Sequence, residues 1–475
     1  MTLRLPTRLE LLAFICGFTL MTYELAAARV LAPTVGSSTY VWTSVIGVII
    51  AALSLGFYLG GQIADARNTR TDVAWLLLLV AGLIALTTVL YPYTLPWIAN
   101  WGVDVRLQAV GAAILLFTPT SFALGMISPY LAKLNVTSLK TSGTAVAKLS
   151  MWDALGGISG TFLTGFFLFG YIGSRAIFVV LVVIVLLSIA LLGVRLGARQ
   201  WGIAGVSLLV VVATPAYSQA LDIDTPSAHY TIFEWEGVKG LYRGLSTGPS
   251  GIQSGVALDD PYTPVFWYTE ELYDLVGQTK HRERILILGG GTFTLPQQLA
   301  LAHPDSQIDV VEIDPGLMKI AREHFYYEDH DNVDVIFEDA RTFVNRTTTR
   351  YDIVIVDAYG DADIPFTFMT QEYGKELQEV TKSEGLVMVN FIAAREDGCE
   401  VYLSALEAPY RANFSQRLLK HNATTGQEKR MPHNIIAIYS HQEVMFEGYE
   451  QPQVATISPY TDDFVPAERL RQKCI

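Results

Sequence analysis

Residues 284–314 read RILILGGGTFTLPQQLALAHPDSQIDVVEID, and this stretch decides the fold of the C-terminal half. A short apolar run ends in three glycines, a helical segment follows from about Leu295, and a second apolar run comes next. Buried strands that alternate with helices are typical of a parallel α/β sheet. We therefore predict a strand, a helix and a second strand here.

Later apolar runs continue this alternation. Three of them predict the third, fourth and fifth strands: VDVIF (333–337), YDIVIVD (351–357) and LVMVNF (386–391). Two more predict an antiparallel pair at one edge: RLLKHN (417–422) and NIIAIYS (434–440). We predict a Rossmann-like α/β domain over 281–475. Between 221 and 280, short runs separated by Gly and Pro predict a small β-hairpin subdomain and linker.

The first two strand ends carry features of a nucleoside site. Gly289, Gly290 and Gly291 let a ligand approach the backbone closely, although GGGTFT is not the GxGxxG motif. Glu312 ends the second strand, about 20 residues further on, where an acidic side chain can accept both hydroxyls of a ribose.

The next two strand ends are acidic. Glu338 and Asp339 end the third strand, at a position that suits an adenine amino group. Asp357 ends the fourth strand and is followed by Asp361 and Asp363. Each carboxylate alone is also a common strand-end cap. Their succession along one sheet edge favours nucleoside binding.

Taken together, these motifs resemble the spermidine synthase family. ILILGGG, VEIDP, EDAR, YDIVIVDAY, the F-x-T-x-EY pattern at 368–373 and GLVMVN carry the resemblance. Gln253 and the run FWYTE (266–270) resemble that family's substrate-gating segment. The N-terminal half is similar to a membrane-bound branch, through YELAAARVLAP, SLGFYLGGQIAD and GGISGTFLTGFFLFGYIGSR.

The resemblance implies transfer of an aminopropyl group from decarboxylated S-adenosylmethionine to a small amine or polyamine, without a metal. It implies that Asp357 is the catalytic carboxylate, which takes a proton from the attacking amine. It further implies donor-binding residues: Gly289, Gly290, Gly291, Glu312 at the ribose, Asp339 with Ala340 at the adenine, and Gln253. The implied amine-binding residues are Tyr268, Tyr359, Asp361 and Asp363.

One segment departs from the family pattern. The soluble enzymes have GGGDGG, in which the Asp helps to bind the donor's amine. This chain has Thr292 at that position, and Phe293 and Thr294 replace the two later glycines. We expect the fold to survive this bulkier, uncharged loop, whereas the substrate is left open.

Charge divides the chain near residue 218. The first part contains 12 Lys and Arg against 6 Asp and Glu, which leaves 21 basic and 40 acidic residues after it. So acidic a C-terminal half argues against nucleic-acid binding, which needs clustered Lys and Arg. It suits either a cationic ligand or a solvated acidic surface.

The sequence predicts no metal site. Its three cysteines (Cys16, Cys399 and Cys474) form no CxxC motif, and its eight histidines form neither HxH nor HExxH. Within the C-terminal half, at most one disulfide is possible, between Cys399 and Cys474.

The N-terminal half predicts an α-helical transmembrane bundle over 1–220. Apolar stretches of spanning length occur near 9–31, 40–64, 73–96, 106–131, 146–170, 175–194 and 200–218, which predicts about seven helices. Thr7 and Glu10 form a capping-box pattern that places the first helix start near Leu9. We expect Gly125–Pro129 to end the regular part of the fourth span, and Gly56 with Gly60 and Gly156 with Gly160 to allow close helix packing.

Ionisable residues occur inside these spans. Glu24, Arg29 and Asp153 lie in or near apolar segments, where a charge is costly and usually paired. They form either a polar site inside the bundle or interfacial anchors and a structural ion pair.

Loop charges predict the topology of a multi-pass protein of the cell membrane. Lys and Arg gather at the N-terminus and in the second, fourth and sixth loops, which places the N-terminus in the cytoplasm. Seven crossings would leave the C-terminal domain outside, so its side depends on whether 200–218 crosses the lipid bilayer. Soluble relatives are commonly oligomers, which leaves a homo-oligomer open.

Three functions remain open at this point. The first is a membrane-tethered aminopropyltransferase. The second is a methyltransferase that uses S-adenosylmethionine on a membrane-associated substrate, which the uncharged Thr292 favours. The third is a non-enzymatic membrane transport or scaffold protein with a degenerate Rossmann domain, because nucleoside donors are cytoplasmic and the predicted domain lies outside.

Overall fold

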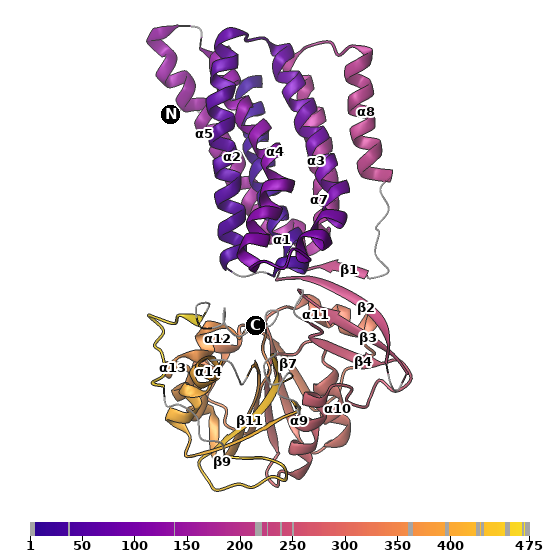
Figure 1. The fold of residues 1–475 in the computed structure, drawn as a ribbon, viewed down its shortest axis with the longest axis vertical. Coiled ribbons are helices and arrows are strands. Elements are labelled where there is room, and N and C mark those ends of the chain that lie inside the picture. Colours follow the sequence, from indigo (N-terminus) through magenta and orange to yellow (C-terminus); the bar gives the residue numbers. More distant parts are fainter. Residues whose placement is uncertain are drawn as a thin grey trace. The chain divides into compact units, whose positions relative to one another are not determined.

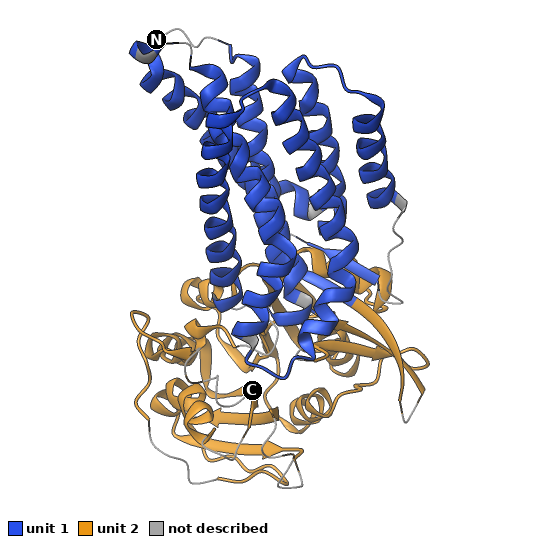
Figure 2. Ribbon diagram, turned by 45° about the horizontal axis from the view of Figure 1, so that its top comes forward, with its two compact units in different colours: residues 1–231, 247–249 blue, residues 232–246, 250–475 orange. Residues whose placement is uncertain are grey.

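The computed structural model describes residues 5–36, 39–136, 138–213, 221–225, 227–237, 240–248, 251–359, 364–394, 399–423, 428, 432–451, 457–467 and 470. The chain forms two compact units (Figure 2). Unit 1 comprises Met1–Thr231 with Thr247–Pro249, and unit 2 comprises Ile232–Ser246 with Ser250–Ile475. The division runs through a β-strand at 231, whereas the sequence predicted boundaries at 220 and 280, which stay predictions.

Unit 1 is a helical bundle (Figure 1). Its main helices are α1 (Arg8–Val35), α2 (Thr39–Ala66), α3 (Arg70–Ala99), α4 (Val105–Asn135), α5 (Ser142–Leu163), α7 (Ser174–Ser188) and α8 (Ala198–Ala213). A π-helical turn, η2 (Thr164–Leu168), and α6 (Phe169–Tyr171) continue α5, while η1 (Leu139–Thr141) precedes it and η3 (Ile189–Leu192) follows α7. The strand β1 (Leu221–Asp224) also belongs to this unit.

Five of the described helices are long and apolar enough to cross a membrane. They cover Arg8–Ala32, Tyr40–Ala66, Arg70–Ala99, Arg106–Asn135 and Ser174–Leu192. The predicted span 146–170 coincides with α5 to α6, and the span 200–218 coincides with α8 up to Ala213, its last residues lying outside the described part of the chain. Neither is among these five. These five helices therefore agree with the predicted membrane bundle. The predicted number of seven spans stays a prediction.

The helix ends test two local predictions. The Thr7–Glu10 capping box is confirmed, because the Glu10 N–H donates to Thr7 Oγ1 and the Thr7 N–H donates to Glu10 Oε2. The expected end of the fourth helix at Gly125–Pro129 is wrong. Helix α4 continues through Pro119 and Pro129 to Asn135. Proline is tolerated in helices of membrane bundles, where neighbouring groups replace the lost backbone hydrogen bond.

Small residues bring the helices of unit 1 together, as predicted. A Cβ on Gly56 would lie 2.2 Å from the Phe122 backbone oxygen of α4. A Cβ on Gly156 would lie 1.9 Å from the Phe14 backbone oxygen of α1. Any larger residue at these positions would push α2 from α4 and α5 from α1.

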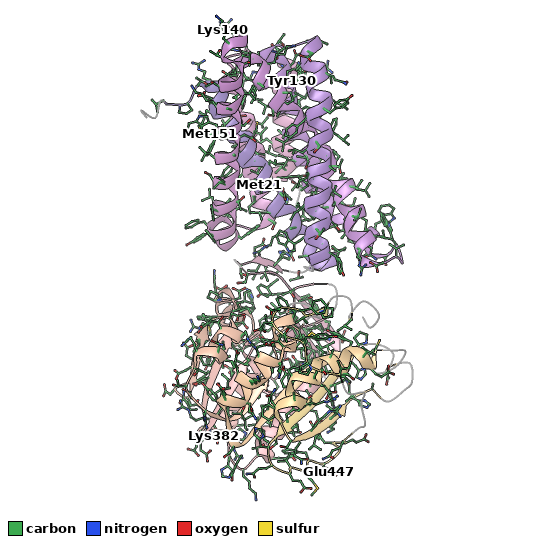
Figure 3. The ribbon with its side chains drawn as sticks, turned by 90° about the vertical axis from the view of Figure 1, so that its left-hand side faces the viewer. Met21, Tyr130, Lys140, Met151, Lys382 and Glu447 are labelled. Atoms are coloured by element: carbon green, nitrogen blue, oxygen red, sulfur yellow. The ribbon has the colours of Figure 1, made fainter. Side chains whose placement is uncertain are left out.

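The outward face of α5 is apolar. Met151, Leu155, Ile158 and Phe162 are each more than a third exposed, and Figure 3 shows Met151 at the outside of the bundle. Such a face suits contact with lipid.

Unit 2 is built on a seven-stranded sheet with the order β10-β11-β9-β8-β5-β6-β7 (Figure 1). The strands are β5 (Arg284–Leu288), β6 (Gln307–Glu312), β7 (Val333–Phe337), β8 (Tyr351–Val356), β9 (Thr381–Ala393), β10 (Gln416–His421) and β11 (His433–Ser440). The first five are parallel, whereas β11 runs antiparallel to β9 and β10 antiparallel to β11. The predicted strands and antiparallel edge pair are confirmed.

The remaining elements of unit 2 surround this sheet. The helices are α9 (Trp267–Gln278), α10 (Thr294–Ala302), α11 (Gly316–His324), α12 (Ala340–Arg346), η4 (Phe366–Met369), α13 (Gln371–Val380) and α14 (Glu400–Asn413). Upstream lie β2 (His229–Gly237), β3 (Gly240–Ser246) and β4 (Ser254–Ala257), with β3 and β4 antiparallel. Cys399, before α14, is disulfide-bonded, and Cys474 lies outside the described residues.

Candidate functional site

The sheet order makes the carboxyl ends of β5 and β8 a topological switch point. Strand β5 pairs with β6 on one side and with β8 on the other, so the chain reverses the direction of strand addition at this point. Ligands of open α/β sheets bind at such a reversal. Gly289 and Asp357 follow these two strands directly.

Gly289 holds the two strand ends close together. Its φ of 103° is one that L side chains rarely adopt, and a Cβ there would lie 2.2 Å from the Asp357 backbone oxygen. Only glycine fits this position. Gly291 also has a positive φ, of 52°. The predicted close backbone approach is therefore present in the turn after β5.

Glu312 lies beneath this turn. Its Oε2 accepts hydrogen bonds from the Gly290 N–H (2.8 Å) and the Gly291 N–H (3.2 Å), and its Oε1 accepts one from the Asp314 N–H (2.9 Å). Burial raises the pKa of the Glu312 carboxyl, although these three backbone donors oppose the rise. A carboxylate offers about four acceptor positions, so one remains for a hydroxyl group of a ligand.

Asp357 is held by a chain of amides. Asn390 of β9 donates its Nδ2 hydrogen to Asp357 Oδ1 at 2.9 Å, and Asn434 of β11 donates to Asn390 Oδ1 at 3.0 Å. Burial raises the pKa of the Asp357 carboxyl to about 6, and the hydrogen bond from Asn390 limits the rise. Asp357 is therefore mainly a carboxylate at neutral pH, with a basicity suited to accepting a proton.

Two tyrosines lie near this carboxylate. Tyr268 donates its hydroxyl to the Gln253 backbone oxygen at 3.1 Å, and Tyr359 donates to the Asn390 backbone oxygen. Burial, followed by the negative charge of Asp357, raises the pKa of both tyrosines. The structure thus brings Gln253, Tyr268, Tyr359 and Asp357 into one neighbourhood.

The third strand end differs from the first two. Asp339 is exposed and caps α12, where its Oδ1 accepts from the Thr342 N–H at 2.9 Å, while Ala340 is buried. Glu338 is paired with Arg346. The predicted Asp361 and Asp363 lie outside the described residues.

The departure at Thr292 has a structural partner. The Thr292 side chain is fully buried, and its Oγ1 lies 2.5 Å from Ser254 Oγ, which also accepts a hydrogen bond from the Thr292 N–H at 3.4 Å. The position therefore carries a pair of neutral hydroxyls. At this position, neither Thr292 nor Ser254 offers a carboxylate to a donor's charged amine.

Phe293 keeps a backbone conformation that favours glycine. Its φ is 57° in the left-handed region, and its side chain is fully buried. The ring lies so close to Gly290 that a Cβ on that glycine would meet it at 2.7 Å. The Phe293 ring therefore packs against the inside of this turn.

Sequence reasoning missed Ser254, Asn390 and Asn434. One signal was present, because Asn390 is a polar residue in the otherwise apolar run LVMVNF. Such a buried amide normally has a hydrogen-bonding partner. The identity of that partner depends on the strand register.

Residues 265–391 match the family model of the spermine/spermidine synthase domain. A polyamine aminopropyltransferase of Vibrio vulnificus is 37% identical over 111 residues, which cover 23% of this chain and 37% of that protein. An eEF1A lysine and N-terminal methyltransferase homolog of Drosophila melanogaster is 26% identical over 143 residues, covering 28% of this chain and 21% of that protein. The chain thus matches about a third or less of the length of these relatives.

Among solved structures, a probable spermidine synthase from Corynebacterium glutamicum is similar, with 24% identity and a TM-score of 0.39. The similarity covers 46% of this chain and 78% of that protein. Within the part of the chain that the structure describes, no group of three or more His, Cys, Asp and Glu side chains could hold a metal ion.

Proposed function

We propose that unit 2, which carries a domain of the spermidine synthase family, transfers an aminopropyl group from a nucleoside sulfonium donor to a small amine. The observation that carries this proposal is the Asp357 carboxylate at the end of β8, fixed by Asn390 beside two tyrosines and the glycine turn. The five apolar helices of unit 1 support tethering of this activity to a membrane.

The residues around the turn fit a nucleoside donor. Gly289 and Gly291 have no side chain to keep a ligand from the backbone, and Glu312 retains one acceptor position for a ribose hydroxyl. Ala340 is small and buried after β7, where an adenine ring would lie, with exposed Asp339 beside it as the acceptor for its amino group. The decarboxylated donor supplies an electrophilic CH2 group on a positively charged sulfur.

Asp357 provides the base for the transfer. An ammonium nitrogen has no lone pair, so the acceptor must lose a proton before or as its nitrogen forms the new C–N bond. The C–S bond breaks in the same step, and its electron pair stays on sulfur, which becomes a neutral thioether. Asp357 accepts the proton from the amine, and its pKa of about 6 leaves it ionised for this role.

Tyr268 and Tyr359 position the amine. Tyr268 is buried and Tyr359 is half-buried near Asp357, and their hydroxyls are directed to the backbone oxygens of Gln253 and Asn390. A rigid aromatic wall restricts the amine to approaches along the carboxylate, and much of the catalysis is then positioning.

The test is product analysis with the full-length chain in detergent. The chain is incubated with decarboxylated S-adenosylmethionine and a linear diamine, and the products are identified by mass spectrometry. The proposal expects equal amounts of the nucleoside thioether and the aminopropylated amine. Absence of both, with a protein that still binds the donor, would refute it.

A second candidate is a methyltransferase, and Thr292 favours it. The hydroxyl pair of Thr292 and Ser254 does not provide the carboxylate that would hold the donor's amine. In S-adenosylmethionine, the donor's own carboxylate balances that amine. Competition binding separates the two candidates, because the aminopropyltransferase must prefer the decarboxylated form. A preference for S-adenosylmethionine, with transfer of a methyl group, supports the second candidate.

A third candidate is a non-enzymatic membrane protein. It follows only if unit 2 lies on the outer side of the membrane, away from the cytoplasmic nucleoside donors. The side of the membrane is a proposal that rests on loop charges. Reporter fusions after Ile475 that are active on one side of the membrane decide it. An external C-terminus would favour this third candidate.

A further inference from the structure

A segment near the C-terminus of unit 2 packs against the start of α13. Residues 459–464 of this segment contain a turn, in which the Phe464 N–H donates to the Thr461 backbone oxygen at 3.0 Å. The Tyr460 and Phe464 rings meet edge to face within it. We call residues 459–464 the C-terminal strap. The strap lies beyond residue 391, where the match to the family model ends.

The strap is joined to the point where the connection from β8 ends and α13 begins. Tyr460 forms a parallel β-bridge with Thr370, and its backbone oxygen accepts a hydrogen bond from the Gln371 N–H at 2.7 Å. The Asp462 N–H donates to Glu372 Oε2 at 3.2 Å. Thr370 is fully buried and is the N-cap of α13. Two main-chain groups of the strap therefore hold the first turn of this helix.

An ion pair joins the strap to α12 as well. Asp462 Oδ2 lies 3.1 Å from Arg341 Nη2, and the same nitrogen lies 3.0 Å from Glu376 Oε1 of α13. The Arg341 side chain is mostly buried, whereas that of Asp462 is half-exposed. The strap thus ties the starts of α12 and α13 together.

The connection between β8 and α13 carries residues of the proposed amine site. It begins with Asp357 and Tyr359, and hydrogen bonds with Asn390 fix these first residues. Near its other end, Ile364 packs against the same core cluster as Tyr460 of the strap. The two ends of the connection are therefore held by different parts of the chain.

The position of the strap favours a role in amine binding over a role in folding alone. The pair of Asp462 and Arg341 is half-exposed, and such pairs contribute little to the stability of a fold. A loosely held connection, by contrast, must be ordered when its ligand binds, and this ordering reduces the affinity. The attachment of the strap should therefore act on the affinity for the amine.

We infer that the C-terminal strap positions the connection between β8 and α13 for the amine, with Tyr460 and Asp462 as its positioning residues. It acts through the connection and not on the amine itself. The inference rests on the proposed function, because it takes the surroundings of Asp357 as the amine site. It goes further in that a segment outside the family match sets the affinity for the acceptor.

The test measures amine binding to the full-length chain in detergent. 1,4-Diaminobutane is titrated by calorimetry in the presence of 5′-methylthioadenosine, the nucleoside thioether that aminopropyl transfer leaves. The strap is detached by replacing residues 459–464 with glycine and serine. The control is the same replacement of residues 442–447, an equally long and largely exposed stretch.

We expect the strap variant to bind the diamine about tenfold more weakly. This factor corresponds to a connection that holds its binding arrangement about one-tenth of the time. Hydrogen exchange at residues 370–372 should become faster, because the Gln371 N–H loses its acceptor. Binding of 5′-methylthioadenosine should not change, because Asp339 caps α12 without the strap.

Single substitutions keep the test independent of whether the long replacement folds. Asp462→Ala should weaken diamine binding about two- to fivefold, within the range of a half-exposed ion pair, and Asp462→Glu should retain most of the affinity. Asp463→Ala removes the same charge one position further on, at an exposed residue that pairs with no cation of the described chain. It should leave diamine binding unchanged.

Two results would overturn the inference. One is equal diamine affinity in the wild type and the strap variant, with hydrogen exchange that shows the strap detached. The other is equal diamine affinity in Asp462→Ala and Asp463→Ala. A wild type that binds the diamine more tightly than the strap variant but forms no product would refute the proposed transfer and support the strap. A wild type that binds no diamine would contradict both.

Discussion

The side-chain amide of Asn390 donates a hydrogen bond of 2.9 Å to Asp357 Oδ1. The bond joins β9 to the end of β8, and Asn434 of β11 fixes the same amide from the other side. No hydrogen bond between described residues uses Asp357 Oδ2. The geometry therefore stabilises the carboxylate through one oxygen and leaves the other for the amine proton.

Activity should fall in acid as Asp357 becomes protonated. Burial raises its pKa to about 6, so the fraction of carboxylate, and with it kcat/KM, should fall as the pH decreases through about 6. A pH profile of aminopropyl transfer measures this limb. A profile that stays flat from pH 7 to pH 5 would exclude Asp357 as the base.

Asn390→Ala should move the acid-side decrease in kcat/KM to higher pH. The variant loses the hydrogen bond that favours the charged form, so the pKa of Asp357 rises further. Asn345→Ala, which removes an exposed amide bonded to Glu376, is the matched control and should leave the limb in place. If kcat/KM falls at the same pH in the two variants, Asn390 does not act on Asp357.

Phe293→Gly should be more stable than Phe293→Ala. Both variants lose the buried ring, but only alanine keeps the cost of a left-handed backbone, which is about 1 kcal/mol. Urea midpoints of the full chain in detergent compare the two. If the Phe293→Ala variant has the higher urea midpoint, the backbone at position 293 is not left-handed in solution.

Arg417→Met should strongly destabilise unit 2. Glu407 is fully buried, and its two oxygens accept from Arg417 at 2.6 and 2.8 Å, with Tyr439 as a further donor at 2.9 Å. Removing the arginine leaves a buried charge without its partner, at a cost of about 3–5 kcal/mol. The urea midpoint measures this loss. Adding Glu407→Leu should recover most of it, and no recovery would contradict this account.

The stability of unit 1 should depend on pH through His229. Burial lowers the pKa of His229, but hydrogen bonds and charges from Asp222 and Asp224 outweigh that effect and raise it to about 9. Because the folded pKa is raised, this stabilisation is complete below an unfolded pKa of about 6.5 and is lost as the pH rises through about 9.

Thermal unfolding of the full chain between pH 6 and pH 10 measures this dependence. His229→Gln should flatten it, whereas His281→Gln, at an exposed histidine, should not. A wild-type midpoint that does not decrease toward pH 10 would contradict the raised pKa.

The sequence predicted the sheet because its local pattern is strong. Apolar runs that end in glycine or acidic residues alternate with helices, and parallel topology then brings Gly289, Glu312 and Asp357 to one edge. These predictions required only the order of strands and helices along the chain.

Other features depend on contacts that a sequence does not show. Asn390 and Asn434 meet because of the strand register between β9 and β11, and Ser254 meets Thr292 across 38 positions. The left-handed conformation of Phe293 has no signal in the residue type itself, because aromatic residues rarely adopt it. The predicted break in α4 was wrong because Pro129 lies in a helix supported by its neighbours.

The rate of a single aminopropyl transfer by Asp357→Asn tests the central claim most directly. Donor and diamine are mixed with excess full-length enzyme, and formation of the nucleoside thioether is followed in wild type and variant. We predict unchanged donor binding and a transfer rate lower by about 10²–10⁴-fold, the usual contribution of a general base. A variant that binds the donor and transfers at the wild-type rate would contradict the assignment of Asp357.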